Sequence, residues 1–153
     1  MNILDKLEEH YQKIDDYFSK LEFEARSRGW KRKVEKYKNR RKIIDQAYFL
    51  FIFTRLEDRI REESAKRIRS KKKSISSWRQ RAAWDLLPSE PDGNLHFKNR
   101  LALLCEKGGK NFNLVWEYYK ERNSIAHGGE FITPISMPTV IPEMKRLYRE
   151  LKA

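Results

Sequence analysis

The sequence predicts an all-α fold: a compact bundle of about five or six helices that forms a single domain over residues 1–153. Three observations lead to this prediction. Apolar residues recur at spacings of three and four in several segments, which is the period of an amphipathic helix. Glycine and proline, which interrupt helices, are absent from residues 30–87. A chain of 153 residues is also long enough to bury a core of its own.

The first predicted helix covers residues 2–28 and ends or bends at Gly29. Acidic residues occupy its outer face. Its apolar positions, spaced by three or four residues, are Ile3, Leu4, Leu7, Tyr11, Ile14, Phe18, Leu21 and Ala25. The segment is therefore predicted to be an amphipathic helix with one face toward the core.

A long second helix is predicted within residues 30–87. Its centre contains seven consecutive apolar residues, 47–53 (AYFLFIF), whose aromatic and β-branched content is also compatible with a buried strand. Charged, helix-favouring sequence continues on both sides, and helical spacing runs from Phe49 through Phe53 to Ile60, which favours a helix. Because its middle is apolar almost all round, we expect a core element or a subunit interface.

Shorter elements follow. Residues 77–87 predict a short helix, and we expect its Trp78 and Trp84 to be buried rather than exposed for base stacking. Residues 88–94 (PSEPDGN) predict a loop and a boundary between two halves of the domain. A further helix is predicted over residues 95–107. The three prolines of residues 130–142 predict an extended loop, and residues 143–151 a last helix.

The formal net charge of +12 is concentrated in two runs. Residues 31–42 hold eight basic residues and one acid, and residues 66–73 hold six basic residues and no acid. Clustering of one sign costs self-repulsion, so we expect nucleic acid as a partner rather than a merely solvated face or an anionic membrane. The predicted RNA-binding residues are Lys31, Arg32, Lys33, Arg40, Arg41, Lys42, Lys71, Lys72 and Lys73.

Neither a membrane span nor a metal site is predicted. No apolar run approaches the roughly 18 residues that a bilayer requires, and the acidic, amphipathic N-terminus is unlike a signal peptide. The lone Cys105 cannot form an internal disulfide, so we expect a cytoplasmic protein with Cys105 in its core. His10 and His96 lack partners at metal-binding spacing, and no metal or other cofactor is expected.

The most informative stretch is residues 116–129 (WEYYKERNSIAHGG), predicted to be a helix that Gly128 closes in the left-handed conformation. Arg122 falls within its apolar stripe. A guanidinium on such a face needs an anion, either a carboxylate of the protein or a phosphate of a ligand. Asn123 and His127, four residues apart, share the neighbouring face. Three groups suited to phosphate chemistry therefore gather at one helix end.

Residues 122–127 (RNSIAH) resemble the R-N-x-x-x-H motif of the HEPN superfamily, all-helical domains found in many prokaryotic ribonuclease toxins and defence proteins. The resemblance implies a catalytic set of Arg122, Asn123 and His127, supported by an acidic residue on an earlier helix, for which Glu57 is the candidate. It also implies a two-fold homodimer with both motifs facing one cleft. Its further implications are a cognate antitoxin or a larger defence complex, and RNA products that end in a 2′,3′-cyclic phosphate or its hydrolysed form.

The residues themselves suit metal-independent cleavage of RNA. His127 is the plausible proton-transfer group, since imidazole titrates near neutrality, and Arg122 is a planar, permanently charged phosphate clamp. On an ideal helix, five residues separate two side chains by roughly 140°. Either the helix unwinds near Ala126 and redirects the imidazole, or a second copy completes the site.

Two alternatives remain open at this point. The chain can be a non-catalytic HEPN-like module that binds RNA or a protein, with Glu57 holding Arg122 in a structural ion pair. It can also be an unrelated basic helical protein that binds DNA or RNA, in which His127 only caps a helix.

Overall fold

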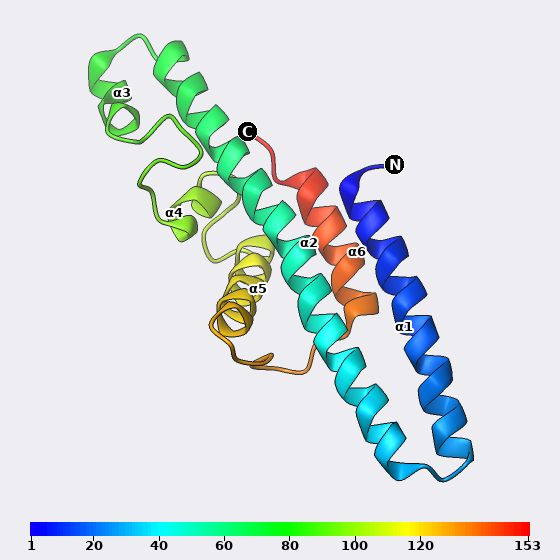
Figure 1. The fold of residues 1–153 in the computed structure, drawn as a ribbon. Coiled ribbons are helices and arrows are strands. Elements are labelled where there is room, and N and C mark those ends of the chain that lie inside the picture. Colours follow the sequence, from blue (N-terminus) through cyan, green and yellow to red (C-terminus); the bar gives the residue numbers. More distant parts are fainter. The chain divides into compact units, whose positions relative to one another are not determined.

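The computed structural model describes residues 1–153 and contains six α-helices and no strand, which confirms the all-α prediction (Figure 1). The helices are α1 (Ile3–Ser27), α2 (Lys31–Ser74), α3 (Trp78–Asp85), α4 (Phe97–Ala102), α5 (Lys110–Ala126) and α6 (Met137–Glu150). None of them is both long and apolar enough to cross a membrane.

Local signals explain where α1 begins and ends. The Asn2 side chain accepts a hydrogen bond from the Asp5 amide at 2.9 Å, and the Asp5 carboxylate accepts one from the Asn2 amide at 3.3 Å. This reciprocal capping box satisfies two amides that the first turn leaves without helical partners. At the other end, Gly29 has a φ of +70°, a left-handed conformation that suits glycine. The predicted first helix is confirmed.

The long second helix is also confirmed, with 44 residues in α2. Phe49, Ile52 and Phe53 are buried at its centre. The side of α2 that carries Ile43 and Phe51 is open, because these residues are 63% and 54% exposed.

The chain divides into two compact units, each built from two stretches of sequence. The first contains Met1–Phe53 and Glu121–Pro142, and the second contains Thr54–Lys120 and Glu143–Ala153. Helices α2, α5 and α6 each contribute residues to both units. The expected boundary at residues 88–94 is wrong, since this loop lies inside the second unit and the borders fall within helices.

In the first unit, α1 and the first part of α2 lie side by side and are joined by polar contacts (Figure 1). The Tyr11 hydroxyl donates to Asp45 Oδ1 at 2.8 Å, and the Tyr11 ring meets Tyr48 edge-on. Arg41 Nε donates to Asp15 Oδ1 at 3.0 Å. Burial raises the pKa of Asp45 above its ordinary value of 3.8, which the hydrogen bond from Tyr11 only partly opposes.

In the second unit, a fully buried arginine organises the loop before α4. Arg100 donates to the Ser64 hydroxyl at 3.1 Å and to the carbonyls of Glu90 and Gly93 at 3.0 and 2.9 Å. A buried guanidinium requires such acceptors. The fixed loop therefore depends on one side chain of α4.

Two further expectations need correction. Helix α6 begins at Met137, so the predicted loop over residues 130–142 ends early. Pro138 lies in the first turn, where no amide is needed, and Pro142 removes only one helical hydrogen bond. Helix α3 has no buried residue, and Trp78 is 67% exposed. The prediction that Trp78 and Trp84 are buried is therefore wrong. The pattern of apolar residues in α3 does not reveal whether another segment covers it.

The Asp45→Asn variant tests the Asp45–Tyr11 contact. In the folded state the raised pKa makes Asp45 bind protons above pH 3.8 more strongly than the unfolded chain does. The stability of the wild type therefore declines as the pH rises through the folded-state pKa. The Asp45→Asn side chain does not titrate, so the stability of this variant shows no such decline. Its amide oxygen still accepts the hydrogen bond from the Tyr11 hydroxyl. We expect urea unfolding to show the variant gaining on the wild type between pH 4 and pH 7, whereas a variant of the exposed Asp16, Asp16→Asn, shows no such gain.

The Arg100→Ala variant is expected to lower the free energy of unfolding by about 3 kcal/mol, because buried acceptors lose their donor. The exposed Arg149 offers a matched control, and Arg149→Ala should change stability by less than about 0.5 kcal/mol. Equal effects of the two variants in chemical unfolding would contradict the structural role of Arg100.

Candidate active site

Helix α5 carries the motif of residues 122–127 and contains residues 116–126 of the predicted helix. The buried residues of α5 recur at a spacing of three and are Phe112, Val115, Tyr118 and Glu121. The half-buried Leu114, Tyr119 and Ile125 flank them. The most buried charge on this face is thus Glu121, which the sequence reading did not single out, rather than Arg122.

The end of α5 is a Schellman motif, as the position of Gly128 predicts. Gly128 has a φ of +82°. Its amide donates to the Ile125 carbonyl at 3.0 Å, and the Gly129 amide donates to the Ser124 carbonyl at 2.9 Å. A Cβ at Gly129 would lie 2.7 Å from the Ser124 carbonyl oxygen, so this glycine is also required. The chain therefore turns sharply directly after His127.

Of the three motif residues, Arg122 and Asn123 lie near the end of α5 and His127 directly follows it. Arg122 is half-buried, and its Nη1 donates to Asn123 Oδ1 at 3.1 Å. Asn123 is half-buried as well, and its carbonyl accepts from the His127 amide at 3.1 Å. The His127 side chain is exposed, one residue beyond the last residue of α5. A guanidinium held by an amide and a solvent-accessible imidazole thus belong to one helix end.

Glu121 fixes the loop that follows this turn. Its carboxylate is buried and accepts from the Ile132 amide at 2.7 Å, the Thr133 amide at 3.1 Å and the Thr133 hydroxyl at 2.8 Å. The Ser124 hydroxyl adds a 2.7 Å hydrogen bond to the Glu130 carbonyl. The sequence contains one pattern that indicates the burial of Glu121. A spacing of three from Val115 through Tyr118 to Glu121 places this acid on the buried face of the helix.

Glu57 is buried in α2 and belongs to the second unit. Its Oε1 accepts from Arg61 Nη2 at 2.8 Å. Arg122 belongs to the first unit. The supporting role of Glu57 stays a prediction.

The predicted RNA-binding residues differ in how they are held. Lys31, Arg32, Lys33, Arg40, Lys42 and Lys73 are exposed. Arg41 is half-buried and pairs with Asp15 and Glu22, and Lys72 donates to the Leu87 carbonyl and the Ser89 hydroxyl. The most accessible cations of this set therefore lie mainly in the first third of α2.

An aromatic residue accompanies these cations. Trp30 is 41% exposed, Lys33 Nζ lies 4.2 Å from its ring centroid, and the Arg28 guanidinium carbon lies 5.0 Å from it. Such cation–π contacts hold the long side chains beside the ring. The sequence reading did not select Trp30, although it directly precedes the basic run.

No group of three or more His, Cys, Asp or Glu side chains is arranged to hold a metal ion. Cys105 is half-buried, and burial raises the pKa of its thiol. Comparison with family models, curated proteins and solved structures found no match to this chain.

The turn after His127 can be tested through Gly128. An alanine at a φ of +82° costs about 1 kcal/mol, whereas asparagine tolerates this region better. We expect Gly128→Ala to lower the free energy of unfolding by about 1 kcal/mol and Gly128→Asn to lower it by about half as much. Chemical unfolding followed by circular dichroism measures both. An alanine variant as stable as the wild type would contradict the Schellman geometry.

Proposed function

We propose that this protein is a metal-independent endoribonuclease of the HEPN type, a toxin or anti-phage defence effector. The observation that carries the proposal is the end of α5, where Asn123 holds the Arg122 guanidinium at 3.1 Å and His127 is exposed. The accessible cations of α2 and the net charge of +12 support an RNA substrate.

In the proposed reaction, the ribose 2′-oxygen attacks the adjacent phosphorus and the bond from phosphorus to the 5′-oxygen breaks. His127 transfers a proton at this centre, either removing it from the 2′-hydroxyl or giving it to the leaving 5′-oxygen. Arg122 binds the phosphate oxygens, on which negative charge increases in the transition state. Asn123 orients Arg122. The products are a 2′,3′-cyclic phosphate and a free 5′-hydroxyl.

The site is proposed to be shared between two copies. Arg122 and His127 diverge by roughly 140° on an ideal helix, so pairing across a two-fold axis can bring the arginine of one copy to the histidine of the other. The basic run of α2 is proposed to hold the RNA backbone with little sequence preference.

The direct test is cleavage of a structured RNA by the purified protein in excess chelator. We expect His127→Ala to lower the rate at least about 100-fold, the usual contribution of an acid–base group, while RNA binding persists. Arg122→Lys should also lower it, since an ammonium cannot bind phosphate in the bidentate manner of a guanidinium. The exposed His10 provides the control, and His10→Ala should cleave like the wild type.

Other outcomes would redirect the assignment. RNA binding without cleavage would identify a binding module, and a preference for duplex DNA would identify an unrelated basic helical protein. Mixing inactive Arg122→Ala and His127→Ala chains tests the shared site, because a mixed dimer retains one intact pair. Recovery of part of the activity supports the shared arrangement, and no recovery argues for a site within one chain.

A further inference from the structure

In the second unit, one face of α3 presents large apolar side chains to solvent. Trp78 is 67% exposed and Leu86, the C-cap residue, is 86% exposed, and α3 has no buried residue. At 100° per residue these two side chains lie about 80° apart around the helix, so they share one face. The exposed Ala83 extends this face. We propose that it binds the surface of an anionic lipid bilayer.

Hydrogen bonds from cationic side chains hold both ends of α3 beside the end of α2 (Figure 1). Before the helix, the Ile75 carbonyl accepts from Arg81 Nη1 at 3.1 Å. After it, Lys72 Nζ donates to the Leu87 carbonyl at 2.6 Å and to the Ser89 hydroxyl at 2.9 Å. A helix of eight residues is too short to persist alone, so these contacts fix the conformation in which the apolar face is presented. Binding then requires little further ordering.

The surroundings of this face are strongly basic. Residues 66–87 contain eight basic residues and one acid, Asp85. Only Lys66 and Arg81 of these cations pair with a carboxylate. The six others leave a positive charge that a negatively charged partner can neutralise.

Two of the unpaired cations are close to the apolar face in the chain and open to solvent. Lys73 is exposed in the last turn of α2. Arg79 is exposed directly after Trp78, and its guanidinium carbon lies 5.6 Å from the ring centroid. Long cationic side chains can reach lipid phosphates while neighbouring apolar side chains enter the boundary of the acyl chains. Tryptophan itself favours the headgroup level of a bilayer.

An anionic bilayer accounts for these features together. RNA would bind the cations, and a base could stack on Trp78, but RNA gains little from the aliphatic Leu86. A second copy of this chain would bring the same positive charge against the face and be repelled. A lipid surface takes up aliphatic and aromatic side chains alike and is negative over a wide area. The basic run of residues 66–73 has no exposed large apolar residue of its own, and the open face of α3 supplies them.

The test is flotation of the intact chain with vesicles of phosphatidylcholine, either alone or with about one third of the anionic phosphatidylglycerol. We expect at least about tenfold tighter binding to the anionic vesicles. Tryptophan emission should shift to shorter wavelength as Trp78 leaves water. Trp78→Phe should bind but lose most of this shift, whereas Trp30→Phe, at a residue that is 41% exposed in the first unit, should keep it.

Removal of the apolar side chains tests the face directly. Trp78→Ser combined with Leu86→Ser should weaken binding to anionic vesicles at least about tenfold, because the apolar contact is lost. The matched control is Phe23→Ser, which removes a side chain that is 73% exposed in the first unit. Because all three positions are exposed, circular dichroism should show an unchanged helix content.

A second pair of variants tests the charge. Lys73→Gln combined with Arg79→Gln should weaken binding to anionic vesicles about tenfold. Lys31→Gln combined with Arg32→Gln removes the same charge from exposed positions of the first unit and should weaken it far less. Parallel titrations use polyglutamate and a short RNA, which supply negative charge without an acyl phase.

Three results would overturn the proposal. The first is no binding to anionic vesicles, or equal binding to neutral ones. The second is an equal loss from the two charge variants, which would reflect net charge alone. The third is a preferred partner other than lipid. Polyglutamate binding as tight as vesicle binding would indicate an acidic protein, and a loss of RNA affinity without a loss of vesicle affinity in the variant of Trp78 and Leu86 would indicate RNA.

The inference does not depend on RNA cleavage. The motif of α5 and the basic run of residues 31–42 belong to the first unit, whereas α3 belongs to the second. Cleavage is measured without lipid, so its absence would leave vesicle binding unchanged. Failure to bind vesicles would likewise leave the role of His127 unaffected.

Discussion

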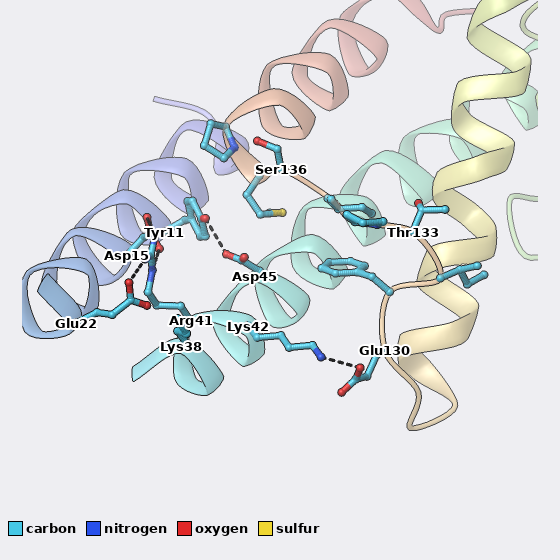
Figure 2. A pocket seen from close by; sticks show the side chains of 16 residues that line it. Tyr11, Asp15, Glu22, Lys38, Arg41, Lys42, Asp45, Glu130, Thr133 and Ser136 are labelled. Atoms are coloured by element: carbon cyan, nitrogen blue, oxygen red, sulfur yellow. Dashed lines mark hydrogen bonds and ion pairs between the residues drawn. The ribbon is translucent and has the colours of Figure 1, made fainter. Parts of the chain in front are cut away.

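A carboxylate removed from water must find hydrogen-bond donors, and Glu121 finds three of them in the loop after α5. This requirement connects two structural features of the first unit. On one side of the loop lies the Schellman turn that exposes His127. On the other side, Phe131 and its neighbours line a cavity of about 660 Å³ (Figure 2). Without Glu121, the backbone at Ile132 and Thr133 would lose its partner in α5. The turn itself would still be held by the carbonyls of Ile125 and Ser124.

Much of the fold follows from local physics that is visible in the sequence. The period of apolar residues predicts α1 and α2. Asn2 caps the start of α1, and Gly29 and Gly128 follow the ends of α1 and α5 in the left-handed conformation. The start of helix α6 is harder to predict from the sequence, because prolines usually argue against a helix. Here Pro138 lies in the first turn, and the buried Met137, Val140 and Ile141 gain more from helical packing than one lost hydrogen bond costs. The exposure of Trp78 depends on which segments cover α3, and no local pattern encodes that.

The grouping of candidate-site residues could be predicted only where these residues are close in sequence. Arg122, Asn123 and His127 lie within six consecutive residues at the end of α5, so their common location follows from the chain itself. The pairs that decide which cations are accessible are distant: 26 residues separate Arg41 from Asp15, and 88 separate Lys42 from Glu130. A run of basic residues looks uniform in the sequence. In the folded protein Arg41 pairs with Asp15 of α1, while its neighbours Arg40 and Lys42 are exposed.

The first turn of α2 has a further consequence. It contains Lys31, Arg32 and Lys33 and no acid, although the amide ends of a helix favour negative charge. These cations repel one another and the helix dipole, and only Lys33 has a nearby ring to lie against. Dissolved salt shortens the range of such repulsion to about 10 Å at 0.1 M. Ionic strength should therefore strengthen this end of the helix, the reverse of its effect on the ion pairs elsewhere in the unit.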